Sequence, residues 1–461
     1  MELTLYDTKS RRLQPVRADR NKVSMYCCGP TVYRDAHVGN LRTFLLSDLI
    51  RRTLHLLGYE VVLIQNITDV GHMSEDLNPD EPDENAAEDK MIAQSRMEKI
   101  DPFEIARKYE ATFHADLARL NIRPADLYPR ASECISLMQD LISNLIREGF
   151  AYIGSDGSVY FDAASFPEYG EISGNRLDSL KPGHRYEYSD DGGKRFHADW
   201  ALWKLAGHRT EMVWDSPWGI GFPGWHIECS AMSLHFLHDH VNLHVGGMDL
   251  RFPHHENERA QSNAITGTEV VDLWVHGEHL LFQGRKMSKS SGNVLLLGEV
   301  IEKGYDPLAV RLVLLENRYR SQMDLTWDSI SAAHKTLQRW RALVAGLPSA
   351  TAVKNEELLM ALSEDLDTPR AIQVIRTLEK SADLTLEFKV GSMLFADQVL
   401  GLDLTRKETR VLTSGLSEIL EQRAVARSEK NWAESDRLRD DLESKGLIIE
   451  DSQSGQEWRW R

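Results

Sequence analysis

The first 65 residues contain a strand, a turn, a helix and a second strand, and this pattern constrains the fold more than any other part of the sequence. Residues 23–28 are rich in β-forming side chains and stop at the turn signal Gly29-Pro30. From Asn40, apolar residues recur at helical intervals, and the apolar run Val61–Ile64 predicts a second, buried strand. A βαβ unit of this kind binds nucleotides where strands end and helices begin.

Two further apolar stretches, 241–246 and 271–276, predict that the same parallel sheet resumes after a long interruption. Residues 154–207 mix short strand-like pieces with Gly, Pro and Asp, so we interpret them as an insertion. Asp306-Pro307 predicts a helix N-terminus. The sequence therefore indicates an α/β protein: a Rossmann-like parallel sheet with an inserted domain, then a helical domain and a small C-terminal α+β module.

Charge and hydropathy exclude several classes of protein. The formal net charge of −17 argues against sequence-independent coating of nucleic acid, but it leaves open an RNA partner bound through local basic surfaces. The candidate surfaces for RNA are these: Arg318, Arg320, Lys335, Arg339 and Arg341. No apolar run reaches the ~20 residues of a membrane span, and the first residues lack signal-peptide features, so we expect a cytoplasmic protein without membrane contact.

Four residues suited to binding metal lie far apart in the sequence. Cys28 ends the first strand, Cys229 follows a Pro-Gly turn, and His254 and Glu258 have the i, i+4 spacing that places both on one helix face. Two thiolates, one imidazole and one carboxylate suit tetrahedral zinc. The residues alone do not decide between His254 and its neighbour His255. Four cysteines are too few for a disulfide framework in a chain of this size, which favours reduced thiols.

Two motifs carry the residue types that bind phosphate. His37-Val38-Gly39-Asn40 stands where the first helix is expected to begin, so that a histidine donor and a close-approaching glycine would meet phosphate oxygens. Lys286-Met287-Ser288-Lys289-Ser290 places two lysines in a polar loop, and lysine suits a pyrophosphate leaving group whose charge grows in the transition state.

At these motifs the sequence resembles the class I aminoacyl-tRNA synthetases, and more closely the cysteinyl-tRNA synthetases. The similarity runs essentially from end to end and includes residues 25–33, 66–69, 223–232, 252–258 and the lysine loop. One departure is Asn40, where the class signature usually has a second histidine. Asparagine donates a hydrogen bond but carries no positive charge, so we expect at most a weaker stabilisation of the transition state.

The resemblance implies an ATP-dependent ligase that activates cysteine to cysteinyl-adenylate and transfers it to tRNA(Cys). Zinc would select the substrate thiol, ATP with Mg²⁺ would be a substrate, and we expect a monomer. One alternative is a cysteine ligase that uses the same adenylation core on an amino-sugar or another non-tRNA acceptor. A second is a non-catalytic RNA-binding relative, which intact motifs argue against.

The resemblance also assigns roles to particular residues. It chooses His254 over His255, so the implied zinc ligands are Cys28, Cys229, His254 and Glu258. The implied catalytic residues are His37, Asn40, Lys286 and Lys289, and those that bind ATP are His37, Gly39, Gly246, Asp249 and Lys289. The implied cysteine contacts are Cys28, Gly29, Thr68 and Trp225. The implied anticodon contacts are Arg427, Trp432, Asp436 and Asp451.

We expect the chain to divide into six segments. In order, they are the first half of the catalytic domain, a connective insertion, the second catalytic half, a lysine-loop and acceptor-stem domain, a helical domain and an anticodon-binding module. The expected boundaries are 1–120, 121–210, 211–285, 286–345, 352–405 and 406–461. The acidic stretch 74–89 carries no catalytic signature, and we expect a solvated loop there.

Overall fold

The computed structural model describes residues 1–71, 89–180, 193–287, 292–407, 414–452 and 455–460. The chain forms two compact units, Met1–Leu404 and Thr405–Arg461, and each is considered by itself. Among the described residues, no helix combines the length and the apolar character that crossing a bilayer demands. Residues 74–88 of the acidic stretch and Lys289 fall in the gaps between the described ranges, so the expectations for them lie outside the described residues. Asp89, the last residue of the stretch, is buried and caps the helix that follows, so it is not part of a solvated loop.

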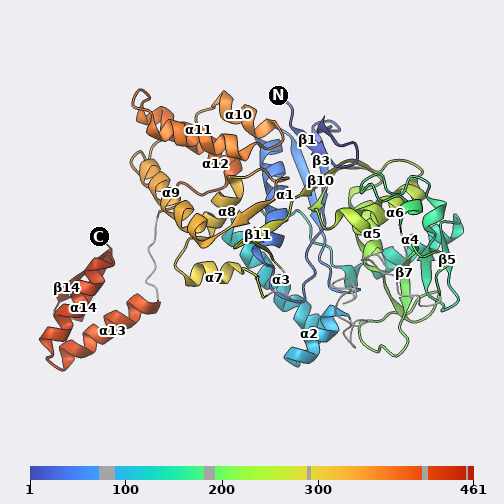
Figure 1. The fold of residues 1–461 in the computed structure, drawn as a ribbon, viewed down its shortest axis with the longest axis horizontal. Coiled ribbons are helices and arrows are strands. Elements are labelled where there is room, and N and C mark those ends of the chain that lie inside the picture. The colour runs from blue at the N-terminus through green and yellow to red at the C-terminus, as the bar shows by residue number, and fades with distance from the viewer. Residues whose placement is uncertain (72–88, 181–192, 288–291, 408–413, 453–454, 461) are drawn as a thin grey trace. The chain divides into compact units, whose positions relative to one another are not determined.

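A four-stranded parallel sheet forms the centre of the larger unit (Figure 1). Its strands are β3 (Lys22–Cys27), β4 (Glu60–Gln65), β9 (Val241–Gly247) and β10 (Val271–Gly277), in the order β10-β9-β3-β4. Helix α1 (Val38–Leu56) connects β3 to β4. The predicted Rossmann-like sheet is confirmed, although strand and helix ends move by one or two residues. Because β3 and β9 begin the two halves and lie side by side, their carboxyl ends form the switch point where such sheets bind ligands.

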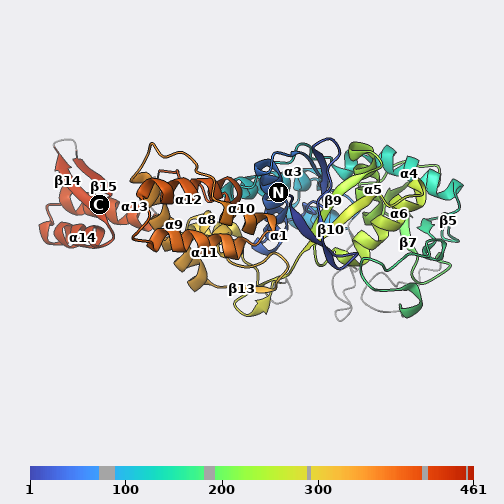
Figure 2. The same ribbon diagram turned by 90° about the horizontal axis from the view of Figure 1, so that it is seen from above.

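Two layers lie on either side of this sheet (Figures 1 and 2). One contains a four-stranded antiparallel sheet with the order β5-β6-β7-β8 and several helices. Its strands are β5 (Ala151–Ile153), β6 (Val159–Phe161), β7 (Trp200–Leu205) and β8 (Gly221–Pro223). Its helices include α4 (Ile135–Arg147), α5 (Trp225–Leu237) and α6 (Glu256–Thr266), and α2 (Lys90–Glu98) and α3 (Pro102–Arg119) precede them.

The other layer is helical and follows a small three-stranded sheet. That sheet consists of β11 (Leu280–Phe282), β12 (Arg285–Lys286) and β13 (Met323–Leu325). The helices are α7 (Leu297–Glu302), α8 (Pro307–Leu315), α9 (Trp327–Ala345), α10 (Glu356–Ser363), α11 (Thr368–Lys380) and α12 (Leu386–Leu400). Asp306 caps α8 as predicted, because its side chain accepts a hydrogen bond from the backbone N–H of Leu308. A two-stranded hairpin, β1 (Thr4–Asp7) with β2 (Arg12–Pro15), begins the chain.

Buried charges join α1 to the helical layer. The carboxylate of Asp48, on α1, accepts hydrogen bonds from Arg52 and from Arg311 of α8, the latter at 2.7 Å. Arg311 is fully buried and also donates to the backbone oxygen of Leu400 at the end of α12. One continuous apolar core runs from Leu3 to Leu404 through both layers. The helix that presents His37 is therefore fixed from behind by packing and by paired charges.

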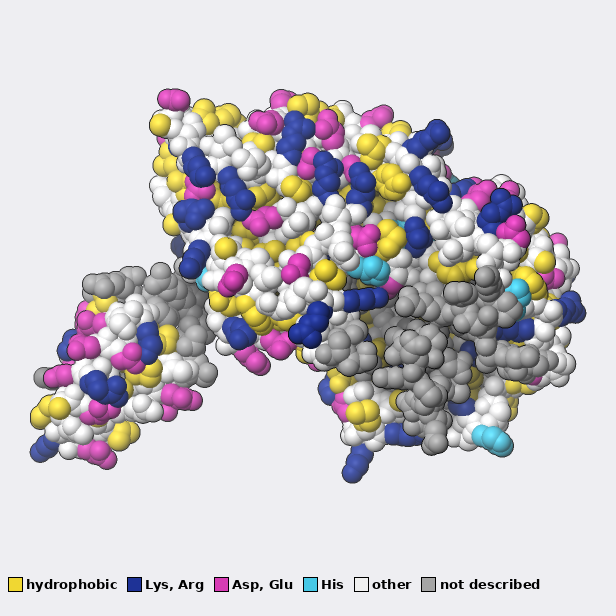
Figure 3. Space-filling view, in the orientation of Figure 1, with side chains coloured by type: hydrophobic (Ala, Val, Ile, Leu, Met, Phe, Trp, Pro, Cys, Tyr) yellow, Lys and Arg dark blue, Asp and Glu magenta, His cyan; other side chains and the backbone are white. Residues whose placement is uncertain are grey.

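The arginines proposed as an RNA-facing surface are engaged in ion pairs instead. Arg341 is buried and pairs with Asp306, while Arg339 pairs with Glu379. Arg318 and Arg320 pair with carboxylates that precede α11. Figure 3 shows Lys and Arg side chains interspersed with Asp and Glu across this part of the molecule. The prediction of an RNA-binding surface was wrong for Arg341, because its side chain is buried against the chain after α12.

The smaller unit contains two helices and a hairpin. They are α13 (Ser414–Ser428), α14 (Trp432–Ser444), β14 (Leu447–Ser452) and β15 (Gly455–Trp460). Its core consists of Leu420, Leu442, Leu447 and Ile449. Gly446 has φ +88° at the turn into β14, which explains why glycine follows the helix there. This content of helix and strand agrees with the small α+β module that the sequence predicts.

Candidate active site and metal centre

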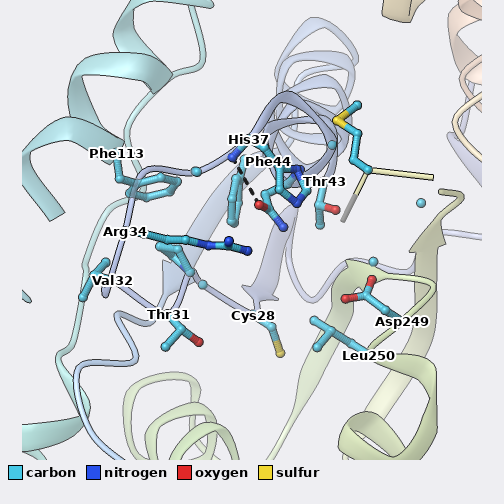
Figure 4. A pocket seen from close by; sticks show the side chains of 18 of the residues that line it. Cys28, Thr31, Val32, Arg34, His37, Thr43, Phe44, Phe113, Asp249 and Leu250 are labelled. Carbon is cyan, nitrogen blue, oxygen red and sulfur yellow. Dashed lines mark hydrogen bonds between the residues drawn. The ribbon is translucent and has the colours of Figure 1, made fainter. Parts of the chain in front are cut away.

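A cavity of about 540 Å³ opens where β3 and β9 end, at the predicted switch point (Figure 4). One wall is the segment from Cys28 to Asn40, which connects β3 to α1. The opposite wall comes from the turn after β9, including Asp249, and from Gly277–Leu280 after β10. Thiol and imidazole groups gather at the base of the cavity, and phosphate-binding residue types gather at the N-terminus of α1.

The four predicted metal ligands meet at the base of the cavity. Their ligand atoms all lie within 4.8 Å of one another, and each residue is at most 4% exposed. The Sγ atoms of Cys28 and Cys229 are 3.9 Å apart, and Cys28 Sγ lies 3.4 Å from Glu258 Oε1. His254 Nε2 lies 2.9 Å from the same oxygen. Cys28 directly follows strand β3, helix α5 supplies Cys229, and the segment after β9 supplies the other two.

The chemistry of this donor set fits a bound divalent cation. Burial raises the pKa of Cys28, raises that of Cys229 to about 11 and raises that of Glu258 to about 7. Three acids are thus buried together, where their anions lack water. The Oε2 atom of Glu258 is also buried and makes no hydrogen bond in the described structure. A metal ion would supply the positive charge and the ligand bonds that these groups lack.

Local structure around His254 differs from the prediction. The sequence predicted that His254 and Glu258 lie on one face of the same helix. Instead His254 lies in a π-helical turn, Arg251–His255, and Glu258 lies in the first turn of α6. The two side chains still meet, with His254 Nε2 2.9 Å from Glu258 Oε1.

A second set of donors shares part of this site. Cys28, His244, His255 and Glu258 also lie within 4.8 Å of one another. The Nε2 atoms of His244 and His255 are 3.4 and 3.3 Å from Cys28 Sγ. This set has one thiolate, whereas the set with His254 has two, and sulfur-rich donor sets favour zinc. The geometry therefore allows either His254 or His255 to bind the metal. The chemistry of the donors favours the set with His254.

The residues implied to contact cysteine occupy different depths. Gly29 lines the cavity, and its N–H donates to Asn66 Oδ1 at 2.7 Å. A Cβ on Gly29 would lie 1.5 Å from the backbone oxygen of Asn66, so only glycine fits. Trp225 also lines the cavity and stacks on His254, with ring centroids 4.1 Å apart. Thr68 is 1% exposed and lies behind this wall rather than among the described lining residues.

A buried hydrogen-bond chain supports this wall. Asn66 Nδ2 donates to Thr68 Oγ1, and Thr68 Oγ1 donates to Glu228 Oε2, both at 3.0 Å. Glu228 neighbours Cys229, so the chain connects Gly29 with the metal centre. Sequence reasoning did not single out Asn66 or Glu228. Both stand in segments that carry the family resemblance, but nothing in the sequence indicates that they meet.

At the other end of the cavity, His37 and Asn40 form a capping box on α1. His37 Nδ1 accepts from the backbone N–H of Asn40 at 3.1 Å, and the backbone N–H of His37 donates to Asn40 Oδ1 at 3.3 Å (Figure 4). Burial, helped by the charge of Arg34, lowers the pKa of His37 to about 4. Because Nδ1 accepts, the neutral ring carries its proton on Nε2 and can donate it to a phosphate oxygen.

Of the other residues predicted to bind the nucleotide, some line the cavity and one does not. Gly39 and Asp249 line the cavity, as does Lys286 of β12, whose side chain is exposed. Gly246 does not face the cavity: a Cβ there would lie 2.4 Å from the His255 ring, so this glycine permits packing of that histidine. The next residue, Gly247, is the one that lines the cavity. Successive residues of a strand face opposite sides, so only one of these two neighbouring glycines faces the cavity.

The expected anticodon contacts lie in the smaller unit. Trp432 is 56% exposed, so it is not a core residue, and the guanidinium of Arg427 lies 5.6 Å from its ring centre. Asp436 is exposed on α14. Asp451 is held by a bidentate ion pair with the buried Arg423 and by Arg427. These contacts fix Asp451 inside the module, and the anticodon role of all four residues stays a prediction.

Comparison with known families identifies both units. The family described as "tRNA synthetases class I (C) catalytic domain" matches residues 14–335. The family described as "Cysteinyl-tRNA ligase anticodon binding domain" matches residues 409–459. A protein named Cysteine--tRNA ligase from Thermus thermophilus is 40% identical over 489 residues, which cover 100% of this chain and 99% of the relative. Cysteine--tRNA ligase 1 from Burkholderia lata is 42% identical over 471 residues, which cover 99% and 96%.

Solved structures share the fold at low identity. Methionyl-tRNA synthetase from Mycobacterium tuberculosis, in complex with methionyl-adenylate, matches with a TM-score of 0.54 and 15% identity and covers 82% of this chain and 89% of its own. The ternary LeuRS–tRNA–LeuAMS complex of Agrobacterium radiobacter matches with a TM-score of 0.58 and 10% identity, covering 83% of each chain. Both likenesses support the fold and nothing finer.

Proposed function

The chain belongs to the family of cysteine–tRNA ligases, and from this membership we propose that a zinc ion bound by Cys28, Cys229, His254 and Glu258 selects cysteine as its substrate. The enzyme is a class I aminoacyl-tRNA synthetase that uses ATP to join cysteine to tRNA. An amino-sugar or other non-tRNA acceptor is not supported, because the relatives match over the full length and the match includes the anticodon-binding family at residues 409–459. The monomeric state and the cytoplasmic location stay predictions.

The observation that carries the zinc proposal is the meeting of four buried donor side chains from distant segments. A zinc ion held by these four residues would bind the substrate thiolate directly and lower the pKa of the thiol. A serine hydroxyl is a poor zinc ligand at neutral pH. A single zinc–sulfur bond would therefore give a larger preference for cysteine over serine than their difference in size allows. Trp225 lines the cavity and stacks on His254, so its ring covers the site from the cavity side.

In the first step an oxygen of the cysteine carboxylate attacks the α-phosphorus of ATP. The bond from that phosphorus to the oxygen bridging the β-phosphate breaks, and pyrophosphate leaves with the electron pair. His37 donates its Nε2 proton as a hydrogen bond to the phosphates, and Asn40 holds the ring in the required orientation. Lys286, the lysine of the lysine loop that lies within the described residues, stabilises the negative charge on the leaving pyrophosphate. The adenylate then passes its acyl group to a ribose hydroxyl of tRNA, and AMP leaves.

Three measurements test this function. Purified protein should contain one zinc ion per chain by elemental analysis. Cysteine should support ATP–pyrophosphate exchange, and serine should be slower by at least ~1000-fold. Bulk tRNA should then accept cysteine. Absence of exchange with cysteine would refute the activity, whereas exchange without zinc, and with cysteine still preferred, would refute the metal's role in selection.

A further inference from the structure

Arg34 occupies the middle of the cavity and has no role in the scheme above. It stands in the connection between β3 and α1, three residues before His37, and its side chain lines the cavity. Figure 4 shows the guanidinium extending across the cavity, with Cys28 on one side and His37 on the other. Its position is therefore between the end that holds the substrate thiol and the end that holds the phosphates.

The guanidinium has no carboxylate partner in the described part of the chain. The cavity's own acidic residues, Asp35, Asp249 and Glu278, form no ion pair with it. Its one described contact is the face of Tyr33, whose ring centre lies 5.2 Å from the guanidinium carbon. Burial lowers the pKa of Arg34, and among neighbouring groups only the Tyr33 phenol opposes that shift. By contrast, the buried arginines Arg52 and Arg311 share the carboxylate of Asp48.

Arg34 is half-buried, and removing its charge from water without a nearby carboxylate destabilises the protein. A bound anion would offset that loss of hydration. Its planar fork matches the paired oxygens of a phosphate or a carboxylate, and stacking on Tyr33 restricts its rotation. In the proposed reaction the cysteine carboxylate and the ATP α-phosphate meet between Cys28 and His37. This follows because the substrate thiol is held at the Cys28 end of the cavity and the β- and γ-phosphates are held at the His37 end.

We propose that Arg34 is a catalytic residue of the activation step, whose guanidinium binds the non-bridging oxygens of the ATP α-phosphate. This inference rests on the proposed function. As the carboxylate oxygen bonds to the α-phosphorus, negative charge accumulates on those oxygens until the bond to pyrophosphate breaks. Arg34 stabilises that charge, and it stays protonated throughout, so it transfers no proton. Its contact with the α-phosphate strengthens in the transition state.

The test compares Arg34→Gln and Arg34→Lys with the wild type in cysteine-dependent ATP–pyrophosphate exchange. Loss of one such donor typically costs about 100-fold, so we expect kcat of Arg34→Gln to fall about 100-fold with little change in KM for cysteine. Arg34→Lys keeps the charge but loses the fork, and should recover part of the loss. Arg147→Gln is the matched control, because that arginine is 68% exposed on α4, outside the residues that line the cavity.

A binding measurement separates a phosphate contact from a structural role. Inhibition of exchange by AMP should weaken about tenfold in Arg34→Gln, whereas inhibition by adenosine, which lacks the phosphate, should not change. Equal weakening of both, unchanged kcat, or a rise in KM for cysteine alone would overturn the proposal. If Arg34→Gln does not fold, the same AMP and adenosine comparison on Arg34→Lys decides. A wild type without cysteine-dependent exchange would instead refute the proposed function itself.

Discussion

The two ends of the cavity are built in opposite ways. The metal end consists of donors from three distant segments, nearly all their surface is buried, and burial favours the neutral forms of their acids. The phosphate end consists mainly of residues 34–40, which are neighbours in sequence at the start of α1 and include the partly exposed His37, and β12 adds Lys286. Selection of the thiol therefore depends on a dry, long-range assembly, whereas phosphate binding depends mainly on one local turn.

The largest effect is expected from removal of one metal ligand. Cys229→Ser should lose zinc and slow cysteine-dependent exchange by about 1000-fold, because a serine oxygen is a poor zinc ligand and the remaining three donors lose their tetrahedral set. Elemental analysis measures the zinc content, and ATP–pyrophosphate exchange measures the rate. Cys134→Ser is the control, since Cys134 is also a buried thiol but caps the start of α4 outside the site. Normal zinc content in Cys229→Ser would break the contrast between the two ends.

A smaller effect is expected at the phosphate end. His37→Ala removes the Nε2 donor and the N-cap of α1, and exchange should slow by about 100-fold. Zinc content should stay at the wild-type value, because no atom of His37 belongs to the metal cluster. Parallel kinetics and metal analysis check this. Loss of zinc in this variant would show that the two ends are not independent.

Asn40→His tests the departure from the class signature. The added imidazole can form a further hydrogen bond to phosphate, so exchange should stay equal or rise within about threefold. Asn40→Ala is the comparison, because it removes the Oδ1 acceptor that binds the His37 backbone N–H. A large loss in Asn40→His would mean that the capping box needs the asparagine amide itself.

The smallest effect concerns the protonation of His37. Burial lowers its pKa to about 4, below the ordinary value of 6.5, so its neutral form persists as pH falls from 7.5 to 5. The unfolded chain takes up this proton near pH 6.5 and the folded protein only near pH 4, so folding stability declines in that window as pH falls. An NMR titration of the His37 ring should show no transition above pH 5. A midpoint near 6.5 would contradict the buried, neutral donor.

Local features of the fold were largely predictable from the sequence. The strand, turn and helix of residues 22–56 follow from β-forming residues, a Gly-Pro turn and helical periodicity, and the structure moved their ends by one or two residues. The cap Asp306 was predicted for the same reason. Errors arose where distant packing decides, as with the π-helical turn before α6, the inward position of Gly247, and the burial of Arg341 against residues after α12.

The candidate site divides in the same way. Residue types and spacing indicated the phosphate motifs and the metal donors, and the resemblance chose His254 over His255. Arg34, Asn66 and Glu228 had no signal that distinguished them from ordinary polar residues. Their importance depends on what lies nearby: a missing carboxylate for Arg34, and a shared hydrogen-bond chain for the other two. Such relations have no period or spacing in the sequence.

Sequence alone determined the local chemistry of this protein, because hydrogen bonds of turns and helix caps join residues three or four positions apart, and side-chain periodicity reports a helix or strand directly. Only the tertiary structure decided which distant side chains share a volume. Sheet order and register bring Cys28 beside Cys229 and Glu258, and they leave Arg34 facing a cavity instead of an acid. Those outcomes depend on packing across the whole domain, which no short stretch of residues encodes.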